Sequence, residues 1–394
     1  MCGPDSTDQR SEPVKVPFGD MKLHYQAYKS QIDQAVHRVL ESGHYILGSE
    51  LEKFEASFAK ALGAGYSAGC ASGTEAIYLA LAAAGVTTGD EVIVVAHTAV
   101  PTISAISMTG ATPVFVDIDP KTYVMDVNLV EAKITPKTKA LVPVHLYGQM
   151  VDMEPLLKIA AKHKIMLLED CAQSTLATYK GAIAGTLGDY GAFSFYPSKN
   201  LGAFGDGGAV STNSSENFDK LVKLRNYGQS KRYYHDIIGI NSRLDEMQAA
   251  ILDAQLPYVE QWNERRREIA KRYNEGLEGV VETPYEAEGR KHVYHLYVIQ
   301  TDDRDGLQAY LLEKGIQCLI HYPNPAHLQK AYSYLGYQPG SLPVTERIVN
   351  RILSLPMHPC LTDEQVDEVI EGIKSFSSEQ KSSKSSKVTA NSIS

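Results

Sequence analysis

The chain has 394 residues, of which 43% are hydrophobic and 22% are charged, and its formal net charge is −9. These values are typical of a globular protein with a sizeable core, divided into one large and one small domain. An acidic chain without basic clusters disfavours a nucleic-acid partner, and the sequence has no apolar run long enough to span a membrane.

Helical periodicity dominates the start of the chain. Residues 1–14 are predicted to be disordered, and apolar side chains then recur at helical spacing from Met21 to Glu41. A second helix is predicted from Ser49 to Leu62. Ser49 is expected to be its N-cap, with Glu52 completing a capping box.

Strand and helix patterns alternate through the middle of the chain. Helical patterns cover residues 73–84, 101–108, 153–163 and 217–226. Strand patterns cover residues 66–71, 91–96, 113–117, 140–145, 165–169, 191–195 and 209–212. Strands rich in Val and Ile, joined by short helical connections, predict a mostly parallel sheet covered by helices.

A long helix, predicted from Ser242 to Tyr273, is expected to lead from the large domain into the small one. After it, strands are predicted at residues 292–300 and 318–321, and helices at residues 304–314, 345–352 and 362–376. The Ser/Lys-rich end, residues 377–394, predicts a disordered tail. We therefore expect a large domain over residues 15–260 and a compact α+β domain over residues 261–376.

The five cysteines are scattered along the chain, and no two of them form a C-x-x-C pair. This pattern favours reduced thiols over a disulfide framework or a zinc site. The polar N-terminus also lacks the apolar core of a secretion signal. These features predict a cytoplasmic protein without a metal centre.

One lysine stands in a glycine-rich turn. Lys199 follows the strand-like run FSFYPS and precedes LGAFGDGG. Glycines let the backbone approach a ligand closely, and a lysine there can act as a point cation or form a Schiff base. Asp170 ends the apolar run KIMLLED upstream, and a buried carboxylate with a lysine is what pyridoxal 5'-phosphate (PLP) requires. Glu169, its neighbour, is expected on the opposite face of the strand.

Two further segments are candidates for ligand binding. Ser72-Gly73-Thr74 directly precedes a predicted helix, whose free N–H groups and positive dipole end suit a phosphate. Simple helix capping by Ser72 or Thr74 is the alternative. His97 ends a predicted strand, where its ring is either a stacking surface for a flat ligand or a core histidine.

Six segments in this order resemble one family: GTEAIYLAL, VPVHLYGQ, LLEDCAQS, AFSFYPSKNLGAFGDGGAV, LRNYGQS and GINSRLDEMQAAIL. They are similar to the DegT/DnrJ/EryC1/StrS family of PLP-dependent nucleotide-sugar aminotransferases, and the resemblance runs from about Val16 to about Phe376. It implies an α/β chain of PLP fold type I, aspartate-aminotransferase-like. The large domain would hold a mostly parallel sheet and the smaller C-terminal domain would be α+β. The resemblance also implies a homodimer with shared active sites.

The resemblance assigns roles to individual residues. Lys199 would bond the aldehyde of PLP, and Asp170 would face the pyridine nitrogen. The other implied cofactor-binding residues are Gly73, Thr74, His97, Gln173, Ser194 and Asn241. Asn241 would be donated by the neighbouring subunit, although N-capping of the long helix fits it as well.

Substrate contacts are also implied for a few polar residues. Arg243, or the basic pair Lys231-Arg232, could pair with the carboxylate of glutamate or the pyrophosphate of a nucleotide. The C-terminal segment that resembles the family's substrate-binding region contains His321, Tyr322 and His327.

The implied reaction moves the amino group of L-glutamate to a nucleotide-linked keto sugar. The motifs look most like members acting on a 3-keto-6-deoxyhexose, with dTDP as the expected nucleotide, and amination of a 4-keto sugar is the alternative. Relatives that are dehydratases carry histidine at the lysine position, so Lys199 disfavours that reaction. The intact pair of Asp170 and Lys199 disfavours a non-catalytic PLP-binding regulator. GAFGDG matches neither a dinucleotide fingerprint nor a P-loop.

Overall fold

The computed structural model describes residues 14–391, with side chains described as far as Lys381. A seven-stranded sheet with the order β1-β9-β8-β5-β4-β2-β3 forms its centre. Its strands are β1 Tyr66–Cys70, β2 Glu91–Val95, β3 Thr112–Val116, β4 Thr138–Val142, β5 Met166–Asp170, β8 Tyr190–Ser194 and β9 Gly208–Thr212. Within this sheet β9 runs against the other strands, so the predicted mostly parallel α/β sheet is confirmed.

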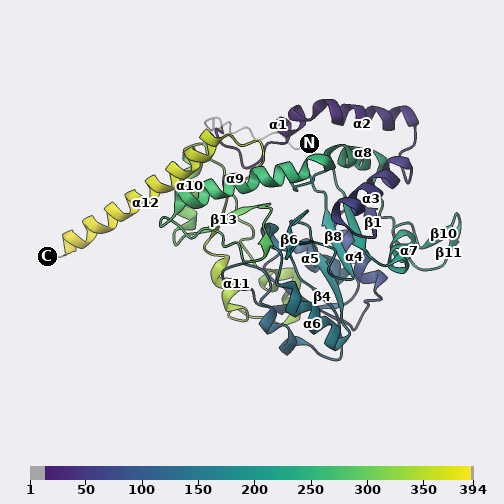
Figure 1. The fold of residues 1–394 in the computed structure, drawn as a ribbon. Coiled ribbons are helices and arrows are strands. Elements are labelled where there is room, and N and C mark those ends of the chain that lie inside the picture. Colours follow the sequence, from purple (N-terminus) through teal and green to yellow (C-terminus); the bar gives the residue numbers. More distant parts are fainter. Residues whose placement is uncertain (1–13, 392–394) are drawn as a thin grey trace, which may run out of the picture.

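Helices pack against this sheet, as the alternating pattern predicts. Helix α4 contacts β8 and β9, α5 contacts β3, and α6 contacts β5 (Figure 1). Their bounds are α4 Gly73–Ala83, α5 Val100–Met108, α6 Met153–His163 and α7 Ser215–Leu224. The sheet strands are almost entirely buried, because apolar helix faces cover them.

Two predicted helices are each divided in the structure. The first consists of α1 (Met21–Ala27) and α2 (Lys29–Ser42), which meet at Tyr28. The long helix predicted from Ser242 to Tyr273 consists of α8 (Glu246–Gln255) and α9 (Val259–Leu277), separated by a 3-10 turn over Leu256–Tyr258. Pro257 lies in that turn, and proline lacks the N–H group that a continuous helix needs.

The C-terminal part is also α+β, but its strands differ from the prediction. Strand β13 (Tyr297–Gln300) pairs with β14 (Ile352–Leu355), which was not predicted and begins at the last residue of a predicted helix. The helix before β14 is α11 (Pro343–Ile348), and α10 covers Arg304–Glu313. Residues 318–321 form no strand and contribute a single bridge from Leu319 to Ser354. Short apolar runs such as ILSL cannot be assigned to helix or strand from periodicity alone.

Helix α12 (Asp363–Asn391) corrects the predicted disordered tail. It continues past Phe376, whose ring packs 5.3 Å from that of Tyr310, and the Tyr310 hydroxyl donates to Glu379. Extending an existing helix costs less than starting one, and the sequence beyond Phe376 contains no proline or glycine. Figure 1 shows α12 projecting away from the body. The predicted disorder of residues 1–13 and 392–394 lies outside the described residues.

The remaining short elements lie around the sheet. A three-stranded sheet has the order β12-β6-β7, and a hairpin of β10 and β11 projects from the body at the end opposite α12 (Figure 1). Bounds are β6 Thr178–Tyr179, β7 Ala182–Ile183, β10 Gln229–Lys231, β11 Tyr234–His235 and β12 Arg290–Lys291. The 3-10 turns are Val127–Leu129, Glu131–Lys133, Leu146–Gly148, Ala326–Leu328 and Lys330–Leu335.

Buried apolar side chains form two large clusters. One contains the central sheet with its helices and reaches Trp262 in α9. The other joins β13, β14, α10 and α12 to the later half of α9, including Ile269 and Tyr273. The domain boundary at residue 260 stays a prediction. Within residues 14–391, no helix is both long and apolar enough to cross a membrane.

A distant carboxylate caps helix α3 (Ser49–Leu62). Gly48 is the N-cap, and Ser49 makes no capping hydrogen bond. Instead Glu246 accepts from the N–H groups of Gly48 at 2.8 Å, Glu50 at 2.9 Å and Leu51 at 3.1 Å. The predicted capping box of Ser49 is therefore wrong, because a tertiary contact occupies the helix N-terminus, where a negative charge is favourable.

Replacing Glu246 with alanine should lower the free energy of unfolding by about 2 kcal/mol, because buried N–H donors lose their acceptor. Urea denaturation followed by circular dichroism measures the change. The matched control is Glu52→Ala in the same helix, where the side chain is exposed. Equal losses in the two variants would contradict the capping role of Glu246.

Candidate active site

Lys199 lies between two cavities. The first, of about 290 Å³, is lined by Asp170 and is called here the Asp170 cavity. The second, of about 270 Å³, is lined by His295 and is called the His295 cavity. The backbone N–H of Lys199 donates to Tyr196 at 2.8 Å, in the turn that follows β8. This turn holds the lysine side chain at the carboxyl end of the sheet.

Six of the predicted site residues line the Asp170 cavity together. They come from the start of α4, the end of β5, the following loop, the end of β8 and the turn after it. These residues are Gly73, Thr74, Asp170, Gln173, Ser194 and Lys199. Ligands of α/β sheets bind at this edge, beyond the carboxyl ends of parallel strands.

The start of α4 forms an anion-binding end of the cavity. Ser72 caps the helix by accepting from the N–H of Glu75, so helix capping is confirmed for Ser72. The N–H groups of Gly73 and Thr74 have no partner within the described chain. A Cβ atom on Gly73 would lie 2.5 Å from the Cβ of Ser194, so only glycine allows this approach. The two free N–H groups and the Ser194 hydroxyl therefore line one end of the cavity, where a phosphate would fit.

Asp170 and Glu169 point to opposite sides of β5, as the strand alternation predicts. Asp170 accepts from the Thr102 hydroxyl at 2.8 Å and from the N–H of Ala172 at 3.1 Å. Burial raises the pKa of Asp170, and the charge of Lys199 acts in the other direction. Asp170 is thus the carboxylate whose charge acts on Lys199 in this cavity, which Asp206 also lines.

Glu169 is occupied by structural contacts. It accepts from the N–H groups of Leu187 and Gly188, both at 2.8 Å, and from that of Gly185 at 3.0 Å. His145 donates to it from Nε2 at 2.9 Å, since Nδ1 of that ring accepts from Val151. The ligating atoms of Glu169, His145 and Cys171 lie close enough together to be considered for a metal ion. The hydrogen bonds above already involve both carboxylate oxygens of Glu169 and both ring nitrogens of His145.

Gln173 is held by two hydrogen bonds at the edge of the cavity. Its carbonyl oxygen accepts from the N–H of Tyr147 at 2.7 Å, and its amide donates to the Tyr322 hydroxyl at 3.1 Å. Burial raises the pKa of Tyr322 to about 12, so this phenol stays neutral. His321 lines the His295 cavity, and its Nδ1 forms a hydrogen bond with the Ser354 hydroxyl at 2.8 Å. The predicted substrate segment therefore does reach the site through His321 and Tyr322.

Two predicted site histidines are core residues in the structure. His97 is buried and donates to the Tyr147 hydroxyl at 2.8 Å, and burial lowers its pKa to about 4. It lines neither cavity, whereas the next residues, Thr98 and Ala99, line the Asp170 cavity. His327 is buried against Glu346 at 3.0 Å and also lies outside both cavities. The predicted ring-stacking and substrate roles are corrected, because each imidazole is enclosed by the protein core.

Arg243 and Asn241 lie away from both cavities of their own chain. The Arg243 guanidinium donates to Asn226 at 3.2 Å and lies over the ring of Tyr227. Asn241 is exposed and bridges to Asn226. The alternative role of Asn241 as a helix cap is wrong, because Asp245 is the N-cap of α8.

Sequence reasoning missed two residues that hold the site together. Thr102 donates to Asp170 from a helix that carried no motif. Tyr147 lies in the quoted segment VPVHLYGQ, and its hydroxyl donates to the carbonyl of His321, thereby joining the two cavities' walls. The sequence signal for Tyr147 was its position before Gly148, and the structure places Tyr147 in a backbone turn with φ of 61°.

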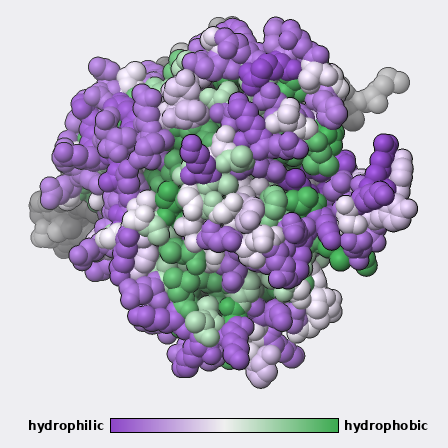
Figure 2. Space-filling model, turned by 45° about the vertical axis from the view of Figure 1, so that its right-hand side comes forward, coloured by the Kyte–Doolittle hydropathy of each residue, from purple (hydrophilic) through white to green (hydrophobic). Residues whose placement is uncertain are grey.

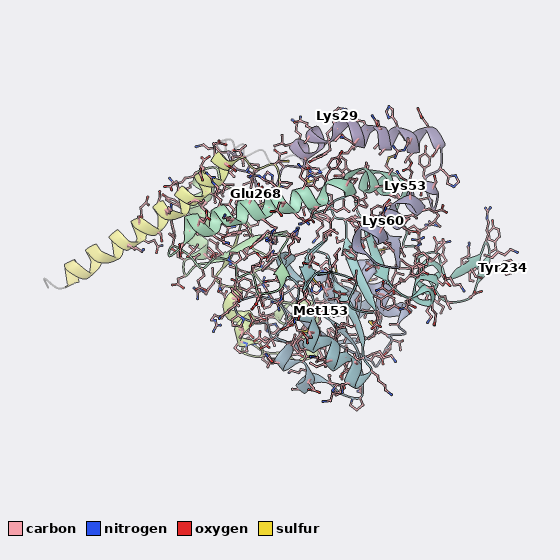
Figure 3. All side chains as sticks on the ribbon, viewed as in Figure 1. Lys29, Lys53, Lys60, Met153, Tyr234 and Glu268 are labelled. Carbon is pink, nitrogen blue, oxygen red and sulfur yellow. The ribbon has the colours of Figure 1, made fainter. Side chains whose placement is uncertain are left out.

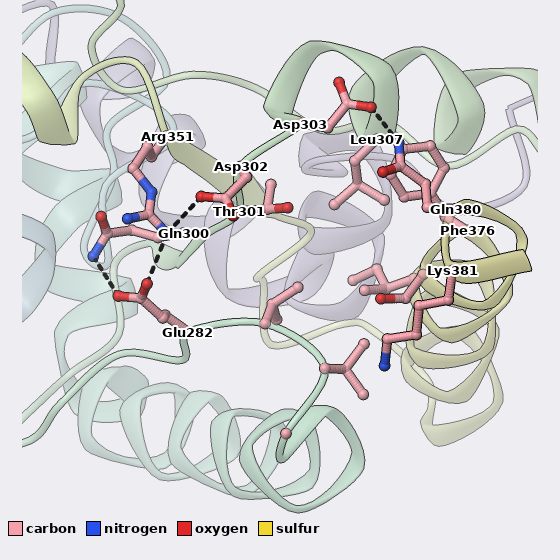
Figure 4. A pocket seen from close by; sticks show the side chains of 15 residues that line it. Glu282, Gln300, Thr301, Asp302, Asp303, Leu307, Arg351, Phe376, Gln380 and Lys381 are labelled. Atoms are coloured by element: carbon pink, nitrogen blue, oxygen red, sulfur yellow. Dashed lines mark hydrogen bonds and ion pairs between the residues drawn. The ribbon is translucent and has the colours of Figure 1, made fainter. Parts of the chain in front are cut away.

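Another hollow, of about 430 Å³, lies between β13, α10 and α12 (Figure 4). Arg351 pairs there with Glu282 at 2.7 Å and with Asp302 at 3.2 Å. None of the predicted site residues lines it. The chemistry-bearing side chains gather instead around Lys199.

Comparison with known proteins defines the class. The chain matches the DegT/DnrJ/EryC1/StrS aminotransferase family over residues 26–374, and it belongs to that family. It is 47% identical to a dTDP-3-amino-3,6-dideoxy-alpha-D-galactopyranose transaminase of Aneurinibacillus thermoaerophilus, over 92% of this chain and 99% of the relative. It is 46% identical to a pleiotropic regulatory protein of Geobacillus stearothermophilus, over 92% of this chain and 99% of the relative.

A solved structure confirms the fold. The protein is similar to DesV of S. venezuelae, solved in complex with a ketimine intermediate, with a TM-score of 0.91 and 44% identity. The similarity covers 93% of this chain and 99% of that one. The predicted aminotransferase fold is therefore confirmed for nearly the whole chain.

Asp170→Asn should lower the rate of transamination by about 10²-fold or more. A neutral amide cannot stabilise the protonated pyridine nitrogen of PLP as a carboxylate does. The matched control is Glu169→Gln on the opposite face of β5, which should lose stability before it loses specific activity. Initial rates and thermal melting of both variants separate the two effects. Equal losses of activity in stably folded variants would contradict the assignment.

Proposed function

We propose that the protein is a PLP-dependent aminotransferase that moves the amino group of L-glutamate to a nucleotide-linked 3-keto-6-deoxyhexose, with dTDP as the nucleotide. The product is a 3-amino sugar. The observation that carries this proposal is the convergence of Lys199, Asp170 and an anion-binding helix N-terminus on one cavity. The similarity to a dTDP-3-amino-sugar transaminase supports the choice of substrate.

The residues of the Asp170 cavity fit PLP. The free N–H groups of Gly73 and Thr74, with the Ser194 hydroxyl, would hold the phosphate, and Asp170 would lie at the ring nitrogen. Gln173 would lie beside the ring. When bound, PLP supplies an aldehyde and an electron sink, the chemistry by which amino groups are transferred.

Lys199 has the properties of the amine that bonds the cofactor. Burial lowers its pKa to about 8, against the opposing charge of Asp170. At neutral pH roughly a tenth of such an amine is uncharged, compared with well under a thousandth at the ordinary lysine pKa. The neutral amine is the form that attacks a carbonyl and that accepts a proton, so burial prepares Lys199 for both tasks.

A regulatory function is the second candidate, since one close relative is called a pleiotropic regulatory protein. A regulator that only binds the cofactor has no need of a lysine with a lowered pKa facing a buried carboxylate. The pair formed by Lys199 and Asp170 therefore favours the enzyme.

The substrate assignment is tested with a panel of 3-keto and 4-keto nucleotide sugars, each incubated with L-glutamate. We expect a 3-amino dTDP-sugar, identified by mass and NMR, with stoichiometric release of 2-oxoglutarate. Lys199→Ala should form no product, because the amine that bonds the cofactor and accepts the proton is lost. Turnover confined to 4-keto sugars would replace the proposed substrate, and no turnover of any sugar would favour the regulator.

We further propose a homodimer with shared active sites. Large apolar side chains are exposed around the β10–β11 hairpin, including Tyr233, which is 78% exposed, and Ile238, which is 96% exposed. Figure 3 shows Tyr234 at the outer end of this hairpin, away from the body. Figure 2 shows hydrophobic residues gathered in a band across one face of the molecule. Such surfaces are typical of an interface, and a two-fold interface would bring the same patch from each chain together.

Asn241 is proposed to complete the phosphate site of the partner subunit, since it lies outside the cavities of its own chain. Its neighbour Ser242 is buried and donates to Glu75 in the first turn of α4, whereas Asn241 itself is exposed, where a partner subunit can contact it. The cytoplasmic location and the lack of a nucleic-acid partner stay predictions from composition.

Mixing inactive Lys199→Ala with an inactive Asn241→Ala variant should restore part of the activity. In a mixed dimer with shared sites, one site carries both defects and the other carries neither. Activity is measured after subunit exchange has been verified by native mass spectrometry. Full activity in a monomeric species, or no recovery in verified mixed dimers, would contradict the shared site.

A further inference from the structure

Lys199 and His295 line one cavity, the His295 cavity, and each has a polar side-chain atom without a partner among the described residues. Within the described chain, the amine of Lys199 makes no hydrogen bond or ion pair, and the His295 ring is bonded only through Nδ1. Buried polar groups in folded proteins nearly always have partners, so an open donor and an open acceptor on one small cavity require an explanation.

A chain of buried amides fixes the proton on the His295 ring. The carbonyl of Thr175 accepts from the Asn263 amide at 3.0 Å, so the Asn263 side-chain oxygen faces Asn200. The Asn200 amide donates to that oxygen at 2.7 Å and to the carbonyl of Val293 at 3.1 Å. Carbonyl oxygens only accept, and therefore neither amide can be reversed.

The oxygen of Asn200 consequently faces His295 Nδ1, at 3.1 Å. An oxygen acceptor at this distance requires the proton to be on Nδ1, which leaves Nε2 as a lone-pair acceptor. The ring is 6% exposed, and burial holds the pKa of His295 well below its ordinary value. The ring is therefore neutral, and its free acceptor is available to the cavity that Lys199 also lines.

We propose that His295 is a positioning residue for Lys199, whose amine donates a hydrogen bond to His295 Nε2 whenever it is not bonded to the cofactor. The proposal rests on the proposed function of Lys199 as the cofactor lysine. This contact is a hydrogen bond, and no proton is transferred in it. A lysine stem is flexible, and a fixed acceptor on the wall of the cavity gives the released amine one position.

Other titratable groups face this cavity from every element around it. His321 exchanges its hydrogen bond with Ser354, and Arg266 donates to three backbone carbonyls. The remaining groups are Asp20, His24, His358 and Cys360, and Asp170 and Asp206 line the neighbouring cavity that Lys199 also lines. Other ring nitrogens on this cavity also have no hydrogen-bond partner among the described residues, namely both of His358 and Nε2 of His321. His295 differs from them in that an amide chain fixes its tautomer, so that its free nitrogen is an acceptor.

Two substitutions separate positioning from a purely structural role. In His295→Asn the side-chain amide stands as many bonds from Cα as Nδ1 does, so it can still donate to Asn200, but the Nε2 acceptor is lost. In His295→Gln the amide reaches the place of Nε2, and the contact to Asn200 is lost. The matched control is His358→Asn, which changes a histidine of the same cavity.

The measurement is the pKa of Lys199 in the full-length, cofactor-free protein, from the pH dependence of trace acetylation quantified by peptide mass spectrometry. His295→Asn should lower that pKa by about one pH unit, or about 1.4 kcal/mol, because the ammonium form loses its acceptor. His295→Gln and His358→Asn should leave it close to the wild-type value. No change in His295→Asn, or an equal change in all three variants, would overturn the proposal.

Two further measurements make the result independent of folding and of the proposed function. In ¹⁵N-histidine NMR of the unmodified protein, His295 should carry its proton on Nδ1, and a proton on Nε2 would overturn the proposal even if the variants do not fold. Borohydride reduction of the cofactor-loaded enzyme should label the Lys199 peptide. A label on another lysine would reject Lys199 as the cofactor residue, whereas the acetylation result would still decide the contact with His295.

Discussion

The site depends on the close approach of the N-terminus of α4 to the ends of β8 and β9. A Cβ atom on Gly73 would overlap the side chain of Ser194, and one on Gly208 would overlap the backbone of Ser72. Glycine at both positions lets the helix begin directly against the sheet. Because the first N–H groups of a helix have no partner of their own, this contact converts a packing arrangement into an anion-binding end of the cavity.

Two adjacent carboxylates at the end of β5, Glu169 and Asp170, have different roles. The alternation of β5 directs Glu169 toward the loop at residues 185–188, where backbone N–H groups and His145 hold it, and Asp170 toward Lys199. A carboxylate that already accepts several hydrogen bonds keeps the loop in place but has little capacity left for a ligand. Asp170, with two partners, keeps its charge directed at the cavity.

The sequence predicted what depends on local pattern and failed where distant residues decide. Val/Ile-rich strands and helical periodicity gave the parallel sheet, and the family motifs gave Lys199, Asp170, Gly73 and Ser194, which share one cavity. The capping box of Ser49 failed because Glu246, from far along the chain, occupies the helix N-terminus. No periodicity indicates that a partner so remote in sequence will compete with a local cap.

His97 and His327 failed as site residues for a related reason. Each belongs to a segment that was interpreted as a binding segment. Only packing determines whether an imidazole ring faces a cavity or the core, and both rings are buried. His295, in contrast, carried no motif and lies on the cavity next to Lys199. Polar side chains acquire their roles from the hydrogen bonds that surround them, and these join segments that are far apart in the chain.

The charge balance at Lys199 depends on burial and on Asp170. Burial lowers the pKa of Lys199 and raises that of Asp170, while the charge of each opposes the shift of the other. Neutral groups near the lysine include Gln173, Tyr322 and His295. Charged side chains also line the two cavities, namely Arg266 and Asp20 on one and Asp206 on the other. Burial and the charge of Asp170 act in opposite directions on the pKa of the lysine, and neutral amides and rings orient hydrogen bonds without adding charge. A ligand that brings its own charges, such as a phosphate and a protonated ring, then meets a complementary group at each end of the cavity.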